Sequence, residues 1–141
     1  MSKTGPIVLV EDDEDDMIVF RDVIHELGVN KELVWFADCQ EAMKYLTTSK
    51  VQPFIIFSDV NLPRLSGIEF KRNIDSDPDL RRRSIPFVFY STSADQVYVN
   101  EAYTKMTVQG FFQKPSKYNE IKDLLRVIIE YWASCKHPNI F

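Results

Sequence analysis

The side chains best suited to chemistry in this sequence are three carboxylates that each follow an apolar run. Glu11 and Asp12 come directly after Pro6–Val10, and Asp59 comes directly after Phe54–Ser58. Carboxylates gathered in a small volume repel one another, and either protonation or a hard cation relieves that repulsion. Oxygen ligands without His or Cys nearby suit Mg²⁺ or a similar ion. If the two runs end side by side, we expect a divalent-cation site there.

A hydroxyl and an amine complete the candidate chemistry. Ser91 ends the apolar run that begins at Pro86, and Lys114 follows the run Gly110–Gln113 and precedes Pro115. Taken alone, Ser91 suits a helix cap and Lys114 suits simple charge balance. Together, a carboxylate nucleophile, a divalent cation, a hydroxyl and an ammonium are the groups that form and hold an aspartyl phosphate.

An unbroken acidic run extends from Glu11 to Asp16. Acids favour the first turn of a helix because they complement the positive end of its dipole. This explanation covers the last three acids of the run. It does not cover Glu11 and Asp12, which precede the helix. For Asp59, a capping or loop carboxylate is the corresponding structural alternative.

Five short apolar runs, separated by helical patterns, are expected to position these groups. The runs are Pro6–Val10, Leu33–Ala37, Phe54–Ser58, Pro86–Ser91 and Gly110–Gln113. Strands separated by helices need crossover connections, so we predict an α/β fold with a parallel sheet and helices on both faces. Ligands of such sheets bind beyond the carboxyl ends of the strands, where the candidate residues fall.

The first helical pattern has one apolar face and a clear end. Met17, Phe20, Ile24 and Leu27 repeat at helical spacing, and Gly28 is typical of the residue just past a helix. We therefore predict a helix that packs this face on the sheet.

The remaining helices are indicated by their starts. Asp38–Glu41 and Ser66–Glu69 both have a capping-box pattern. Ser93–Gln96 introduces an amphipathic stretch through Met106, which is the fourth predicted helix, and a long final helix begins near Ser116.

Composition limits the class of protein. The chain has 141 residues, of which 45% are hydrophobic and 27% charged, which predicts one globular domain over residues 1–141 with a core from about 6 to 133 and a short C-terminal tail. The net charge of −4 argues against nucleic-acid or membrane partners, so we interpret Arg81–Arg83 as a solvated loop. Without a signal peptide or a bilayer-length apolar stretch, and with Cys39 and Cys135 far apart, we expect a cytoplasmic protein with reduced thiols.

Four segments together resemble the receiver domain of bacterial two-component response regulators. They are Ile7–Asp13, Asp59–Gly67, Ser91–Ser93 and Phe111–Pro115. The resemblance extends from Ile7 to about Trp132, and its specificity lies in the combination. It implies a flavodoxin-like fold whose five-stranded parallel sheet has the order 2-1-3-4-5.

The resemblance implies a role for each acidic candidate. Asp59 would be the phosphoacceptor and would take a phosphoryl group from a sensor histidine kinase. Glu11, Asp12 and Asp59 would bind Mg²⁺, directly or through water, together with the backbone carbonyl of Asn61.

It also implies a switch. Ser91 would donate a hydrogen bond to the phosphoryl group, Lys114 would pair with its oxygens, and Phe111 matches the aromatic switch position. Three residues depart mildly from the family pattern: Glu11 replaces the commoner Asp, Ser91 replaces Thr, and Leu62 stands where Met is frequent. None of these changes removes a chemical role.

The expected output face consists of the fourth predicted helix, the fifth strand and the final helix. Apolar residues are spread around these helices more widely than one inward stripe requires: Val97, Tyr98, Val99, Tyr103, Met106, Val127 and Tyr131. Packing on the sheet explains part of this set. The surplus is consistent with a surface for a downstream target, a phosphotransfer protein or a homodimer.

The leading hypothesis is a stand-alone receiver that signals through phosphorylation-dependent protein contact or a phosphorelay, and it is not a classical enzyme. A haloacid-dehalogenase-type phosphatase also uses a strand-end Asp with Mg²⁺, but it needs a second Asp where Asn61 stands. A flavodoxin-like cofactor binder would need a phosphate-binding loop after the first strand, and acids there would repel the phosphate. A scaffold that no longer takes phosphate is a third alternative, against which the retained reactive groups argue.

Overall fold

One parallel sheet organises the residues that the computed structural model describes, 4–92 and 95–137. Its five strands lie in the order β2-β1-β3-β4-β5. They are β1 (Ile7–Val10), β2 (Leu33–Phe36), β3 (Ile55–Ser58), β4 (Phe87–Ser91) and β5 (Gly110–Gln113). The predicted α/β fold and strand order are confirmed, and every strand falls within a predicted apolar run.

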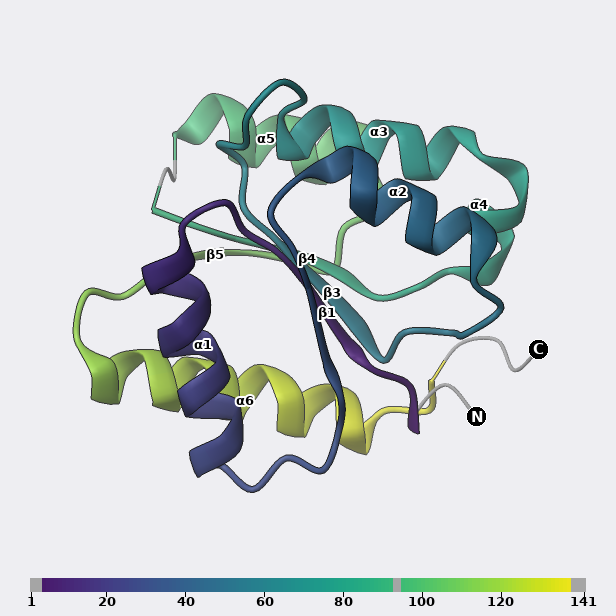
Figure 1. Ribbon diagram of the computed structural model, residues 1–141. Coiled ribbons are helices and arrows are strands. Elements are labelled where there is room, and N and C mark those ends of the chain that lie inside the picture. Colours follow the sequence, from purple (N-terminus) through teal and green to yellow (C-terminus); the bar gives the residue numbers. More distant parts are fainter. Residues whose placement is uncertain (1–3, 93–94, 138–141) are drawn as a thin grey trace.

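Helices cover both faces of the sheet. Within the described residues they are α1 (Glu14–Glu26), α2 (Cys39–Thr48), α3 (Gly67–Ser76), α4 (Pro78–Arg83), α5 (Gln96–Lys105) and α6 (Tyr118–Ser134). Figure 1 shows α1 and α6 on one face and α2, α3 and α5 on the other, with the short α4 following α3. None of the helices among the described residues combines the length and apolar character that crossing a bilayer requires.

The core is divided by the sheet into two layers. In β1, Ile7 and Leu9 pack in the layer on the side of α1 and α6, whereas Val8 and Val10 pack in the layer on the side of α2 and α3. Side chains alternate between the faces of a strand, so a strand covered on both sides must be apolar throughout. This is why the central strands read as unbroken apolar runs.

Local hydrogen bonds begin and end the helices much as predicted. Asp13 precedes α1 and its side chain accepts a hydrogen bond from the Asp16 N–H, at 3.1 Å. Ser66 does the same for the Glu69 N–H at the start of α3, at 3.2 Å. Gly28 follows α1 with φ of 70°, a conformation that glycine adopts without strain. The predicted helix end at Gly28 and the predicted cap at Ser66 are therefore confirmed.

At two other helix starts, the capping side chain accepts from the N–H two residues further on, instead of three. Asp38 accepts from the Gln40 N–H at 2.6 Å, and Asp95 accepts from the Val97 N–H at 2.9 Å. Ser93–Ala94, which form part of the pattern before the fourth predicted helix, lie outside the described residues. Because of α4, that predicted helix is α5 here, and the final predicted helix is α6.

The interpretation of Arg81–Arg83 as a solvated loop is wrong, because these residues end α4. Asp77 caps this helix, with its side chain accepting from the backbone N–H groups of the next turn, and Pro78 occupies the first turn, where proline is tolerated. Arg83 is buried and donates hydrogen bonds to the carbonyl oxygens of Leu46 and Val51. The hydrogen bonds of the Arg83 guanidinium therefore connect α4 to the end of α2 and the segment after it.

The helix α5 is weakly attached to the core. Among its residues, Ala102 is the buried one. Val97 and Tyr103 are exposed, as are Val127 and Tyr131 on α6. The surplus of apolar residues predicted for this face is thus exposed at several positions.

Candidate functional site

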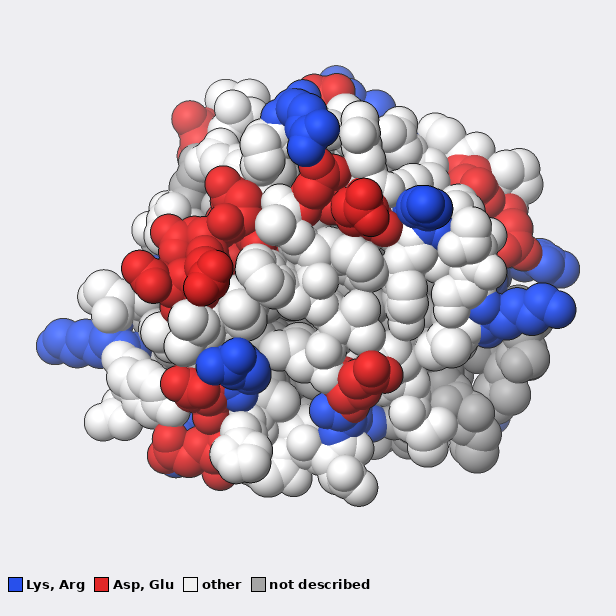
Figure 2. All heavy atoms as spheres, viewed as in Figure 1, with Lys and Arg blue, Asp and Glu red and all other residues white. Residues whose placement is uncertain are grey.

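The candidate groups meet at the carboxyl edge of the sheet because the strands end in register. Val10 pairs with Ser58, and Ser91 pairs with Gln113. The Asp59 N–H donates to the Val10 carbonyl at 3.0 Å. The residues that follow these strand ends are therefore held at one edge by the backbone itself. Figure 2 shows acidic side chains gathered over the N-terminal end of α1, beside this edge.

Asp59 is buried, and both oxygens of its carboxylate accept hydrogen bonds. Its Oδ1 accepts hydrogen bonds from the Val60 N–H at 2.7 Å, the Asn61 N–H at 3.2 Å and the Ser91 hydroxyl at 2.6 Å. Its Oδ2 accepts from the Lys114 ammonium at 3.0 Å. Backbone donors thus fix the plane of the carboxylate, while a hydroxyl and a cation stand beside it.

Lys114 joins three carboxylates. Its Nζ lies 3.0 Å from Asp59 Oδ2 and 3.0 Å from Asp16 Oδ2, and it also donates to Glu11. Burial alone would lower the pKa of Lys114, but the contacts with Glu11 and Asp59 outweigh it and raise that pKa. The Tyr90 ring centroid lies 5.6 Å from Nζ. The ammonium therefore stays protonated in a site with an excess of negative charge.

Glu11 is a buried acid held at both ends. Its backbone carbonyl accepts from the Trp35 indole N–H at 2.7 Å, and its Oε2 accepts from the Asp13 N–H at 3.1 Å. Burial raises the pKa of Glu11 to about 7, an effect that Lys114 opposes and Asp59 increases. A carboxyl held in this way ionises more readily when a cation joins it.

Three carboxylate oxygens come close enough to hold one metal ion. One oxygen each from Glu11, Asp12 and Asp59 lies within 4.8 Å of the others. Asp12 is exposed, so this cluster is open to solvent on one side. An oxygen-only donor set with few carboxylates fits a hard cation that keeps several waters. The donor set therefore agrees with the predicted Mg²⁺ site.

The loop after Asp59 is held by close backbone contacts. A Cβ on Gly67 would lie 1.9 Å from the Asp59 carbonyl oxygen, which no side chain can satisfy without displacing the strand end. The Gly67 N–H donates to the Val60 carbonyl at 2.8 Å, and the Cys39 thiol donates to the Leu65 carbonyl at 3.4 Å. These contacts keep the candidate nucleophile and Asn61 in a fixed relation.

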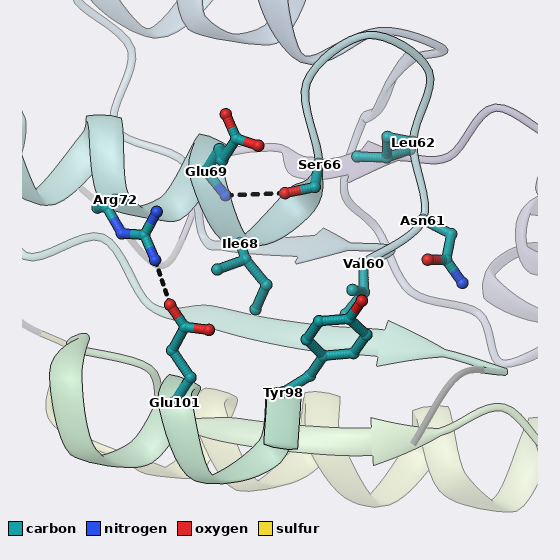
Figure 3. Close-up of a pocket in the computed structure, with 9 residues that line it drawn as sticks. All are labelled: Val60, Asn61, Leu62, Ser66, Ile68, Glu69, Arg72, Tyr98 and Glu101. Carbon is teal, nitrogen blue, oxygen red and sulfur yellow. Dashed lines mark hydrogen bonds and ion pairs between the residues drawn. The ribbon is translucent and has the colours of Figure 1, made fainter. Parts of the chain in front are cut away.

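A cleft of about 610 Å³ opens beside this loop, between α3 and α5. Figure 3 shows Asn61 and Leu62 at one end of it and Tyr98 across from them. An ion pair between Arg72 of α3 and Glu101 of α5 crosses the cleft (Figure 3). This pair links α3 to α5 across the cleft.

Phe111 lies on β5 and packs against the core layer on the side of α2, α3 and α5. Its ring is half-buried, with its centroid 5.4 Å from that of Phe89. Its N–H donates to the Tyr103 hydroxyl of α5, at 2.9 Å. The predicted switch residue is therefore linked directly to α5, whereas Ser91 is linked to Asp59.

Sequence reasoning brought together Glu11, Asp12, Asp59, Ser91 and Lys114, and the structure places all of them at one edge. It missed two neighbours of the lysine. In the sequence, Asp16 is explained by the start of a helix, and Tyr90 is one residue within the apolar run Pro86–Ser91. Lysine at the end of one strand and an acid three residues into the first helix offered no signal of contact, because that contact depends on how α1 is rotated on the sheet.

Comparison with known proteins agrees with this geometry. A family model described as the response regulator receiver domain matches residues 7–126. The probable methanogenesis regulatory protein FilR2 of Methanothrix harundinacea is 28% identical over 130 residues, covering 89% of this chain and 82% of FilR2. Response regulator Rcp1 of Synechocystis is 28% identical over 131 residues, covering 89% of this chain and 87% of Rcp1.

Solved structures of similar proteins have the same fold. The phosphorylated cyanobacterial phytochrome response regulator RcpA has 30% identity and a TM-score of 0.85, covering 96% of this chain and 99% of that one. The Mn²⁺-bound form of Rcp1 has 26% identity and a TM-score of 0.82, with the same coverage of 96% and 99%. Phosphorylation and Mn²⁺ are features of those two proteins.

Proposed function

This chain belongs to the response regulator receiver domain family, and on that premise we propose that it accepts a phosphoryl group on Asp59 from a sensor histidine kinase. The observation that supports this proposal best is the convergence of Asp59, Ser91, Lys114 and Glu11 in one buried cluster. The protein would then be a signalling protein whose own residues assist phosphoryl transfer.

The proposed transfer needs little from the protein beyond position and charge. A carboxylate oxygen of Asp59 attacks phosphorus, a P–O bond forms, and the P–N bond to the donor imidazole breaks with its electron pair staying on nitrogen. The product is an acyl phosphate. The backbone donors of Val60 and Asn61 hold the carboxylate in place for this attack.

Charge on the phosphoryl oxygens must be neutralised during transfer. Lys114 already lies 3.0 Å from Asp59 Oδ2 and is positioned to pair with one of these oxygens. Glu11, Asp12, Asp59 and the Asn61 carbonyl would hold Mg²⁺, which when bound supplies further positive charge to the phosphoryl group.

The signal would follow from the new charge. The Ser91 hydroxyl, which now donates to Asp59, would donate to the phosphoryl group and draw the end of β4 toward it. A shift of this kind favours one of two arrangements of α5 and Phe111. The face formed by α5, β5 and α6 would then present its exposed apolar residues to a downstream target, to a phosphotransfer protein or to a second copy.

We propose further that residues 1–141 form one receiver domain that acts in the cytoplasm, without nucleic-acid or membrane partners. The net charge of −4 argues against attraction to nucleic acid or to an anionic membrane.

Intact-mass measurement tests the proposal. The protein is incubated with Mg²⁺ and acetyl phosphate, beside Asp59→Asn and the control Asp123→Asn, whose side chain is exposed on α6. We expect wild type and the control to gain one phosphoryl group and Asp59→Asn to gain none. An unchanged mass in wild type would favour the scaffold alternative, and turnover of p-nitrophenyl phosphate would favour a phosphatase.

A further inference from the structure

Lys114 is shared between the phosphoacceptor and the first helix. Its Nζ lies 3.0 Å from Asp59 Oδ2 and equally 3.0 Å from Asp16 Oδ2. The Lys114 side chain is 6% exposed, whereas that of Asp16 is 46% exposed. The ammonium therefore sits between an interior acid and an acid that solvent can reach.

All of the donors on Lys114 are in use. An ammonium has three N–H groups, and the contacts of Lys114 are with Glu11, Asp16 and Asp59. A new acceptor beside Asp59 must displace one of these bonds or share it. Asp16 therefore competes with the phosphoryl group for the Lys114 ammonium.

The start of α1 does not by itself require an acid at this position. Glu14 and Asp15 lie in the same first turn and also complement the helix dipole. Within the described residues, neither of them forms an ion pair with Lys114. The Asp13 side chain accepts from the Asp16 N–H, which fixes the turn that points Asp16 toward the lysine.

Asp16 also stands apart from the acids that would hold a metal ion. The cluster of converging carboxylate oxygens consists of Glu11, Asp12 and Asp59. A cation bound there would neutralise those acids and leave the charge of Asp16 beside Lys114. That charge would repel an incoming phosphoryl group and would hold the ammonium toward α1.

We propose that Asp16 is a positioning residue that weakens the phosphorylated state by competing for Lys114, an inference that rests on the function proposed above. Phosphorylation would then require an efficient phosphodonor, because the negative charge of Asp16 opposes a phosphoryl group on Asp59. Replacing Asp16 by the isosteric Asn removes the charge and leaves the helix start intact.

Beryllofluoride in the presence of Mg²⁺ is a suitable probe, since it binds a carboxylate as a phosphoryl mimic. We expect Asp16→Asn to lower the apparent Kd for beryllofluoride about three- to tenfold, the effect of removing one charge a few ångströms away. Asp15→Asn is the matched control, with the same charge change in the same helix turn, and it should stay within about twofold of wild type. Asp16→Glu should restore wild-type affinity because it restores the charge.

The outcomes separate the two proposals. Wild type that fails to bind beryllofluoride contradicts the proposed function itself. Wild type that binds, with Asp16→Asn equal to Asp15→Asn or weaker than wild type, overturns the competition. Thermal unfolding of each variant shows that it is folded, and Asp16→Glu gives a second reading in which only the charge is retained.

Discussion

Two buried lysines, at opposite ends of the sheet, show how similar groups serve different purposes. Lys71 of α3 contacts Asp75 at 2.8 Å and the Thr107 hydroxyl at 3.0 Å, and its side chain is 3% exposed. Lys114, with a side chain 6% exposed, contacts three acids. The first lysine is balanced by one carboxylate, and the second lies in an excess of negative charge.

The balanced pair is a structural clip. Asp75 accepts from Lys71 and from both the N–H and the hydroxyl of Thr107, which precedes β5. Burial would raise the pKa of Asp75, but these donors outweigh it and lower that pKa. The ionised carboxylate is therefore favoured by its surroundings, and the clip joins α3 to the segment between α5 and β5.

The unbalanced cluster has the opposite character. Burial raises the pKa of Glu11 to about 7, so its charged form is disfavoured where it stands. An excess of buried negative charge is unfavourable in the free protein and is relieved when a cation binds. The comparison suggests that charge imbalance, more than burial, distinguishes a reactive site from a structural one.

Breaking the clip should have the largest effect on stability. Asp75→Asn leaves the Lys71 ammonium buried without its counter-charge, and we expect the free energy of unfolding to fall by about 3 kcal/mol, measured by urea unfolding at pH 7. Because the folded-state pKa of Asp75 lies below its ordinary value of 3.8, the wild-type advantage is present above that pH and is lost as the pH falls through the folded-state pKa. The two proteins should converge in acid, and an undiminished difference there would contradict the charge argument.

Adding Mg²⁺ should stabilise the protein through the unbalanced cluster and leave the contribution of the clip unchanged. At a hundredfold excess of Mg²⁺ over its Kd, wild type should gain about 2.7 kcal/mol in the free energy of unfolding. Asp75→Asn should show the same gain from its lower baseline, whereas Asp12→Asn should show a smaller one. An equal response from Asp12→Asn would place the cation elsewhere.

The same substitution at Asp59, the proposed phosphoacceptor, should act in the opposite direction. Asp59→Asn removes one acid from the unbalanced cluster while its side-chain oxygen can still accept from Val60 and Ser91. In the presence of a chelator we expect a gain of about 1 kcal/mol in the free energy of unfolding. A loss comparable to that of Asp75→Asn would show that Asp59 is part of a balanced structural network.

The smallest effect on the free energy of unfolding should come from an exposed ion pair that crosses the cleft between α3 and α5. Arg72 and Glu101 join α3 to α5, and the Arg72 side chain is 53% exposed. Arg72→Ala should lower the free energy of unfolding by only about 0.5 kcal/mol, because water and salt screen the pair. An effect as large as that of Asp75→Asn would mean that exposure does not govern these contacts.

The sequence predicted those parts of the site that depend on strand ends. Glu11, Asp59, Ser91 and Lys114 follow parallel strands, and such ends share one edge of the sheet whatever the details of packing. The strand order came from the family resemblance and is confirmed.

Contacts that depend on helix rotation were beyond reach of the sequence pattern. Asp16 meets Lys114 and Lys71 meets Thr107 only because α1 and α3 pack at particular angles. The burial of Arg83, which lies in the run predicted as a solvated loop, depends in the same way on how the end of α2 packs against α4. The type of a charged residue does not indicate whether its side chain faces water or a buried carbonyl group.

The most direct measurement of the central claim locates the phosphoryl group itself. After incubation with Mg²⁺ and acetyl phosphate, borohydride reduction converts an acyl phosphate of aspartate to homoserine, which peptide mass spectrometry then locates in the chain. The account predicts homoserine at position 59 alone. Reduction at Asp12 or Asp16, or none anywhere, would contradict it.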